Sequence, residues 1–127
     1  GIKLINDTYN ANPASLAVAL EVLKQYRGEK WLALGAFGEL GADSERIHSE
    51  MGRDIKNAGV QRLFATGAMA ENTVQAFGVG AEYFAAQDDL IKSVKEQITP
   101  EQTLLVKGSR AQKMEVVVNA LLNVTGN

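Results

Sequence analysis

Apolar runs of strand length alternate with amphipathic segments of helical length along this chain, and this alternation is what most limits its possible folds. The clearest run, residues 31–34 (Trp-Leu-Ala-Leu), is apolar at every position. Continuous apolarity indicates a strand covered on both faces, as in a parallel sheet flanked by helices. Strands are predicted at residues 2–5, 31–34, 60–66, 82–85 and 103–106. We therefore expect a three-layer α/β domain with a mainly parallel sheet of about five or six strands flanked by helices.

Local signals predict where the helices begin and which face they bury. Pro13 suits a first helical position because its missing N–H has no intrahelical partner there. The expected N-caps are Asn12, Asp43, Asp88 and Ser109, the last with Gln112 at capping-box spacing. The apolar stripes expected to face the core include Leu16, Ala19, Leu20, Val22 and Leu23 in the first helix, and Met114, Val117, Val118, Leu121 and Leu122 in the last.

Composition narrows the classes of function. The 127 residues fit one domain, spanning 1–127, that can bury a hydrophobic core. A net charge of -2 argues against a nucleic-acid partner, and the lack of cysteine excludes a disulfide framework or a thiolate nucleophile. No apolar run is long enough for membrane insertion. The chain opens on a glycine and a strand, so we expect it to be a piece of a longer protein.

Polar loops follow four of the predicted strands. They cover residues 7–13, 35–43, 67–69 and 107–110. Because ligands of open α/β sheets bind at the carboxyl ends of the strands, we expect these loops to share one edge of the sheet.

The first loop places a carboxylate, a phenol and two amides at that edge. These groups belong to Asp7, Tyr9, Asn10 and Asn12. Beside a helix N-terminus they suit a phosphate or carboxylate ligand. The same residue types are common in turns that bind nothing, because they hydrogen-bond their own backbone. The spacing alone leaves both interpretations open.

The last loop, Lys107-Gly108-Ser109-Arg110, joins two cations to an expected helix N-terminus. It suits a carboxylate or phosphate, with Arg110 able to form a bidentate pair. A solvated basic turn in which Ser109 only caps the helix is equally compatible. Neither G-x-x-x-x-G-K-[ST] nor G-x-G-x-x-G occurs, so a self-sufficient nucleotide site is not predicted.

Three further polar residues lie in or after the second loop. Glu39 can reach a substrate amine or a metal-bound water, or can face solvent. His48, the single histidine, follows Ser44 by one helical turn. Neighbours on one helix seldom supply a catalytic triad, and no G-x-S-x-G elbow is present. No metal site is predicted, because one histidine cannot form a His-rich zinc site.

Three segments resemble one family in order and spacing. They are residues 4–13 (Leu-Ile-Asn-Asp-Thr-Tyr-Asn-Ala-Asn-Pro), residues 38–41 (Gly-Glu-Leu-Gly) with Ser44 and His48, and residues 105–110 (Leu-Val-Lys-Gly-Ser-Arg) leading to Met114-Glu115. Together they resemble the C-terminal domain of Mur ligases, and most of all those that add D-Ala-D-Ala to a UDP-N-acetylmuramoyl-tripeptide. The chain departs from the family at Ala36 and Phe37, where an acidic residue and a methionine are often found.

The resemblance implies part of an ATP-dependent amide ligase of cytoplasmic peptidoglycan precursor synthesis. It implies a Rossmann-like lid that closes over ATP and positions the incoming dipeptide. ATP and Mg²⁺ would serve the full-length enzyme, whose central ATP-binding domain carries the phosphate loop and the metal ligands. An N-terminal domain would bind the UDP-sugar. Neither domain is in this sequence, so we expect the isolated chain to be inactive and to bind no cofactor tightly.

The resemblance also implies roles for individual residues. On the nucleotide side it places Asp7, against the ribose, with Tyr9, Asn10 and Asn12. Facing the incoming dipeptide it places Lys107, Gly108, Ser109 and Arg110. Lining the cleft it places Glu39, Ser44 and His48.

Two other interpretations fit the residues without the resemblance. One is a free-standing nucleotide- or phosphate-binding α/β module. The other is a non-catalytic interaction protein.

Overall fold

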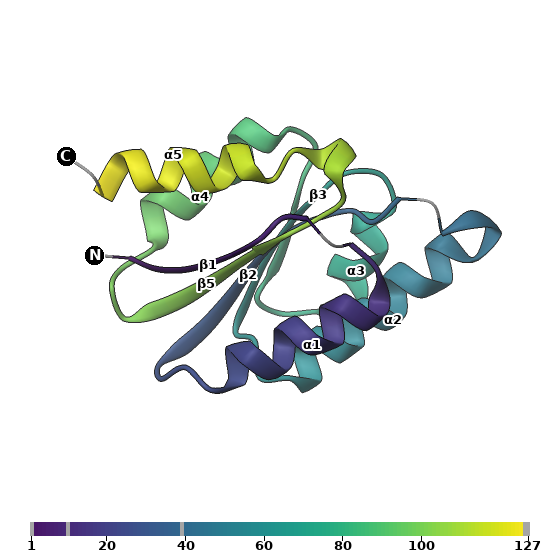
Figure 1. Ribbon diagram of the computed structural model, residues 1–127. Helices are drawn as coiled ribbons and strands as arrows, with labels where there is room; N and C mark the ends of the chain where they lie inside the picture. Colours follow the sequence, from purple (N-terminus) through teal and green to yellow (C-terminus); the bar gives the residue numbers. More distant parts are fainter. Residues whose placement is uncertain (1, 10, 39, 126–127) are drawn as a thin grey trace.

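The computed structural model describes residues 2–9, 11–38 and 40–125. Within them, strands and α-helices alternate along the chain (Figure 1). The strands are β1 (Lys3–Asp7), β2 (Glu29–Gly35), β3 (Arg62–Thr66), β4 (Ala81–Phe84) and β5 (Gln102–Lys107). The α-helices are α1 (Pro13–Lys24), α2 (Ser44–Asn57), α3 (Ala70–Phe77), α4 (Gln87–Gln97) and α5 (Glu115–Thr125), and short 3₁₀ helices, η1 (Gly41–Asp43) and η2 (Arg110–Gln112), precede α2 and α5.

The strands form one five-stranded sheet in the order β1-β5-β2-β3-β4, and every neighbouring pair is parallel. The predicted mainly parallel sheet is therefore confirmed, with five strands. All the carboxyl ends of the strands lie at the same edge, which we call the carboxyl rim. The loops after β1, β2, β3 and β5 share this rim, as expected.

Helices cover both faces of the sheet, with α1, α2 and α3 on one face and α4 and α5 on the other (Figure 1). Successive residues of β2 serve the two faces in turn, as strand geometry requires. Leu32 and Leu34 belong to the core on the α1 side, and Trp31 and Ala33 to the core on the α5 side. This arrangement confirms the three-layer fold.

The start of α1 agrees with the sequence, whereas two other expected caps were wrong. Asn12 Oδ1 accepts a hydrogen bond from the Ser15 amide at 2.8 Å, directly before Pro13. Asp43 makes no side-chain cap, because η1 leads into α2 and the Asp43 carboxylate pairs instead with Arg46 at 3.5 Å. The N-cap of α4 is Ala86, which places Asp88 inside the first turn.

The last helix begins later than predicted. The Ser109 side chain makes no cap hydrogen bond, and η2 ends in a left-handed turn at Lys113 (φ 52°) before α5 starts at Glu115. The predicted inner stripe is correct except at its end, because Leu122 is 49% exposed.

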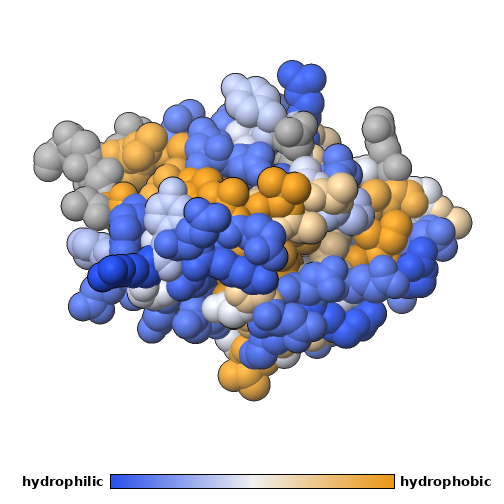
Figure 2. Space-filling model, turned by 60° about the horizontal axis from the view of Figure 1, so that its bottom comes forward, coloured by the Kyte–Doolittle hydropathy of each residue, from blue (hydrophilic) through white to orange (hydrophobic). Residues whose placement is uncertain are grey.

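The α1 side of the molecule leaves some apolar side chains at the surface. Val22, expected to face the core, is 41% exposed, and Val18 is 65% exposed. Figure 2 shows hydrophobic residues among the hydrophilic ones on the face that the rotation brings forward. No helix within the described residues combines the length and the apolarity needed to cross a lipid bilayer.

Candidate functional site

At the carboxyl rim, the end of the first strand meets the end of the last strand. Asp7 ends β1 and Lys107 ends β5, and the two are register partners in the parallel pair. Their side chains form an ion pair, with Lys107 Nζ 2.8 Å from Asp7 Oδ2. Segments 100 residues apart thus meet at one point of the rim.

The ion pair changes the role expected for Lys107. Its side chain is 0% exposed, whereas that of Asp7 is 30% exposed. Lys107 was expected in a loop that faces a substrate, but β5 continues through it, and it pairs with Leu34 of β2 in the ladder. A buried ammonium requires a counter-charge. Lys107 therefore fixes the position of the Asp7 carboxylate and does not face the rim itself.

Glycines at three strand ends let residues 112–114 pack closely against the sheet. A Cβ on Gly35 would lie 2.7 Å from Gln112 Cβ, and a Cβ on Gly108 would lie 2.7 Å from Met114 Cγ. A Cβ on Gly67, whose φ is 102°, would lie 2.7 Å from Gln112 Oε1. These glycines serve the packing of residues 112–114 against the sheet. The sequence signal was a glycine at or just after the ends of β2, β3 and β5.

A side chain from α4, on the same face of the sheet as α5, holds the same segment. Gln87, the first residue of α4, donates from Nε2 to the carbonyl oxygens of Gln112 at 2.8 Å and Lys113 at 3.2 Å. The segment, which follows Arg110 by two residues, is thus held by the strand-end glycines and by α4. Sequence reasoning did not identify Gln87.

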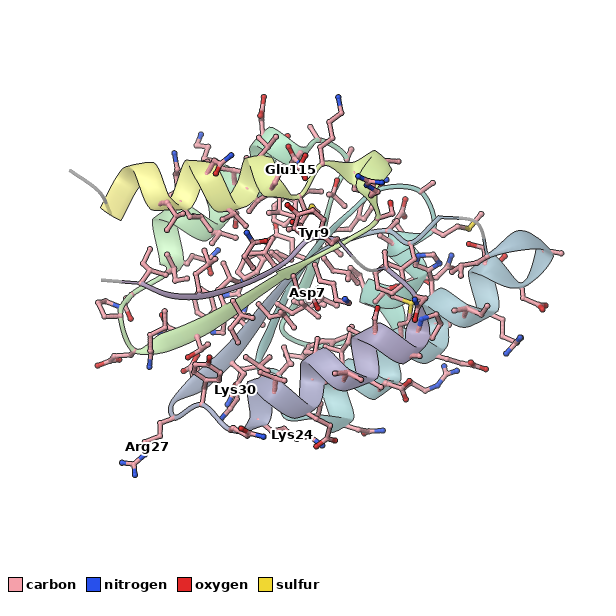
Figure 3. The ribbon with its side chains drawn as sticks, viewed as in Figure 1. Asp7, Tyr9, Lys24, Arg27, Lys30 and Glu115 are labelled. Carbon is pink, nitrogen blue, oxygen red and sulfur yellow. The ribbon has the colours of Figure 1, made fainter. Side chains whose placement is uncertain are left out.

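Two pockets lie next to each other on the rim. The first, the Gly38 pocket, has a volume of about 270 Å³ and is lined by Tyr9, Ala11, Gly38, Ser109, Arg110 and Ala111. The second, the Glu115 pocket, has a volume of about 220 Å³ and is lined by Thr8, Tyr9, Arg110 and Glu115. Tyr9 and Arg110 line both pockets, and Tyr9 is 77% exposed. In Figure 3, Tyr9 lies between Asp7 and Glu115.

The predicted rim residues are therefore only partly brought together. Tyr9, Ser109 and Arg110 line pockets, and Asp7 lies at the end of the same strand that leads into Tyr9. The Asn12 side chain caps α1 through Ser15. Asn10 and Glu39 lie outside the described residues.

His48 is buried beneath the second loop and does not line the cleft as expected. It is 0% exposed, and its Nε2 accepts a hydrogen bond from the Phe37 amide at 3.1 Å. Its Nδ1 lies 2.8 Å from the Ser44 carbonyl oxygen, so the neutral ring donates there. A ring nitrogen that donates to this carbonyl cannot also take the proton of the Ser44 hydroxyl, 3.3 Å away. His48 therefore supports the loop from within, and half-buried Ser44 is part of that support.

The described residues hold no group of three or more His, Cys, Asp or Glu side chains placed to bind a metal ion. Among the described residues at and beside the two pockets, the charged groups are those of Asp7, Arg110 and Glu115, together with the Tyr9 phenol. This set can bind hydroxyl, carboxylate, phosphate and ammonium groups.

Comparisons with known proteins agree on one family. The family described as "Mur ligase, glutamate ligase domain" matches residues 1–110. The UDP-N-acetylmuramoyl-tripeptide--D-alanyl-D-alanine ligase of Escherichia coli is 42% identical over 120 residues, which cover 93% of this chain and 26% of that protein. The chain thus spans about a quarter of the length of this relative.

Solved structures give the same result. A crystal structure of MurF from Acinetobacter baumannii superposes with a TM-score of 0.83 at 30% identity, covering 97% of this chain and 29% of that one. MurF from Thermotoga maritima in complex with ADP shares the fold, with a TM-score of 0.79 at 24% identity, over 92% of this chain and 27% of that one. The chain belongs to the Mur ligase family, as the resemblance in its sequence indicated, and corresponds to the C-terminal, glutamate ligase domain of these enzymes.

Proposed function

We propose that this chain is the C-terminal domain of an ATP-dependent ligase that adds D-Ala-D-Ala to a UDP-N-acetylmuramoyl-tripeptide in the cytoplasm. Its partner is the central ATP-binding domain of the same polypeptide, against which the carboxyl rim closes. The relative named for this reaction, matched over nearly the whole chain, supports the substrates.

The observation that carries the proposal is the gathering of the first and last strand ends at one rim. Asp7 and Tyr9 come from β1 and the loop after it, and Ser109 and Arg110 follow β5. Tyr9, Ser109 and Arg110 border two small pockets on a surface, and Asp7 ends the strand that leads into Tyr9. A surface of this kind forms half of a cleft, and a second domain supplies the other half.

The nucleotide side of the cleft is assigned to the Asp7–Tyr9 end of the rim. The Asp7 carboxylate is held in place by Lys107 and is still partly exposed, so it can accept hydrogen bonds from the ribose hydroxyls of ATP. Tyr9 offers an exposed aromatic face beside it. The expected roles of Asn10 and Asn12 on this side stay predictions, and Asn12 contributes by fixing the start of α1.

The dipeptide side is assigned to the loop after β5. Arg110 can form a bidentate pair with the free carboxylate of the incoming dipeptide. Ser109 lines the pocket beside it. Gly108 acts by allowing residues 112–114 to pack closely, and Lys107 acts through Asp7.

The reaction forms an amide from a carboxylate and an amine at the expense of ATP. Phosphorylation of the tripeptide carboxylate gives an acyl phosphate, the dipeptide amine attacks its carbonyl carbon, and inorganic phosphate leaves. Mg²⁺ would neutralise phosphate charge when bound, and we assign it no ligand in this chain. The contribution of this domain is to hold the two reactants in line and to exclude water from the acyl phosphate on closure.

A domain exchange tests the proposal. In the Escherichia coli relative, this chain would replace the corresponding C-terminal segment. We expect phosphate release from ATP that depends on both D-Ala-D-Ala and the tripeptide substrate. The native segment, rejoined at the same junctions, is the positive control, and Arg110→Ala in the exchanged protein should lose most of the dipeptide-dependent rate.

Two outcomes would contradict the proposal. One is a folded exchanged protein that releases no phosphate while the rejoined control does. The other is tight binding of nucleotide by this chain alone, which would favour the free-standing nucleotide-binding module.

A further inference from the structure

The Glu115 pocket presents opposite charges to one small space. Arg110 comes from the loop after β5 and Glu115 from the first turn of α5, with Thr8 and Tyr9 completing the lining. Figure 3 shows Glu115 on the same side of the sheet as Tyr9 and away from Arg27 and Lys30. The third segment of the family resemblance leads to Met114-Glu115, but no role was assigned to Glu115.

The two charges line the pocket without pairing. Across the part of the chain that the structure describes, neither Arg110 nor Glu115 takes part in an ion pair within 4.0 Å, whereas other neighbouring opposite charges do, such as Arg46 with Glu50 at 2.8 Å. Both residues are exposed. A guanidinium and a carboxylate that line one pocket without pairing complement a ligand that has an anionic end and a cationic end.

We infer that the Glu115 pocket binds a small zwitterion end to end, with the ligand carboxylate on Arg110 and its ammonium group on Glu115. On the proposed function, on which this assignment rests, the zwitterion is the incoming D-Ala-D-Ala. Its two residues span at most about 7 Å when extended, which exceeds the reach of a direct ion pair. The pocket, about 220 Å³, is smaller than the roughly 300–1,000 Å³ typical of drug-sized ligands.

The assignment gives the pocket a means of selection. A ligand without the ammonium group would leave the Glu115 carboxylate facing an uncharged end, and it would bind less tightly because hydrogen bonds to charged groups are the stronger ones. Glu115 would also hold the nitrogen at a defined place beside Tyr9, which lines both this pocket and the Gly38 pocket.

A ligand without the ammonium group tests this assignment directly. In the full-length ligase that carries this domain, we would measure the KM for D-Ala-D-Ala and the inhibition constant of D-lactoyl-D-alanine, in which a hydroxyl replaces the ammonium. Glu115→Gln should raise the KM roughly tenfold to a hundredfold. It should leave the inhibition constant within about twofold, since that ligand has no charge for Glu115 to bind. The KM for ATP should not change.

Two further variants control for a structural role of Glu115. Glu115→Asp keeps the carboxylate and should recover part of the affinity for D-Ala-D-Ala. Glu101→Gln removes an exposed carboxylate just before β5, at the edge of the sheet opposite the carboxyl rim, and should change neither constant. If Glu115 only stabilised the first turn of α5, Glu115→Gln would lower Tm and would weaken the binding of both ligands equally.

The possible failures are distinguishable. If Glu115→Gln leaves the KM for D-Ala-D-Ala unchanged, or weakens both ligands by the same factor, the assignment of Glu115 is wrong and the ligase proposal stands. If the unaltered full-length protein does not use D-Ala-D-Ala at all, both are wrong.

Discussion

The Asp7–Lys107 ion pair ties the edge strand β1 to the interior strand β5 at the point where the rim begins. Lys107 is fully buried, and such a charge costs several kcal/mol to desolvate unless a counter-charge compensates for it. Asp7 is partly exposed, so it links the sheet interior to the rim. The pair therefore serves stability and site geometry together.

Removal of the carboxylate should destabilise the domain. For Asp7→Ala we expect the free energy of unfolding to fall by about 2–3 kcal/mol, less than the roughly 3–5 kcal/mol found for wholly buried pairs, because Asp7 is partly exposed. Denaturant unfolding of the isolated variant measures this. We also expect a higher KM for ATP in the full-length ligase.

A double variant tests whether the unpaired Lys107 ammonium causes the loss of stability in Asp7→Ala. In Asp7→Ala with Lys107→Met, the buried ammonium is gone, so the double variant should be more stable than Asp7→Ala alone. Additive losses in the two single variants would show that the ion pair does not couple the strands.

Lys107 shows where local sequence patterns stop being informative. Asp7, Tyr9, Ser109 and Arg110 could be selected from the sequence because polar groups after apolar runs mark strand ends. Lys107 was placed in the loop for the same reason. Its burial depends on a carboxylate 100 residues away, and no pattern within a few residues of Lys107 encodes that distance.

At the scale of elements, a local capping signal sets the start of the first helix, α1, but not that of the last helix, α5. The Asn12–Pro13 signal sets the start of α1 because the hydrogen bonds that satisfy it come from the next three residues. Ser109 and Gln112 have a comparable spacing, yet α5 begins at Glu115. Packing of residues 112–114 onto the glycines, together with Gln87, overrides the local preference.

This packing makes Gly35 sensitive to a single methyl group. In Gly35→Ala, the new Cβ would lie 2.7 Å from Gln112 Cβ and 2.8 Å from Met114 Cγ. We expect the free energy of unfolding to fall by about 1–3 kcal/mol from overpacking. Because residues 112–114 follow Arg110, the KM for D-Ala-D-Ala in the full-length ligase should rise as well.

Gly38→Ala is the matched control. A Cβ at Gly38 meets no described atom within 4 Å, and the substitution reduces the freedom of the unfolded chain. Its stability should stay equal or rise by up to about 1 kcal/mol. Equal losses in the Gly35 and Gly38 variants would show that backbone freedom, and not close packing, is what these glycines supply.

At the scale of the whole molecule, the sheet order decides which loops meet. The chain begins at the edge strand β1, and β5 inserts between β1 and β2. The alternation of strands and helices predicted parallel strands with one common rim, but it contains no information on which strands are neighbours. Only this order places the loop after β1 beside the loop after β5, and so creates the pockets that Tyr9 and Arg110 share.

Because those pockets lie on the surface of one domain, we expect the chain by itself to fold but not to catalyse the reaction. Produced alone, it should unfold in one cooperative transition, since helices cover both faces of its sheet, but it should release no phosphate from ATP with D-Ala-D-Ala present. Addition of a separately produced fragment with the N-terminal and central domains should restore dipeptide-dependent release, because catalysis here depends on holding two reactants between two domains. Phosphate release by the chain alone would place the phosphate chemistry within this domain and contradict its role as one half of a cleft.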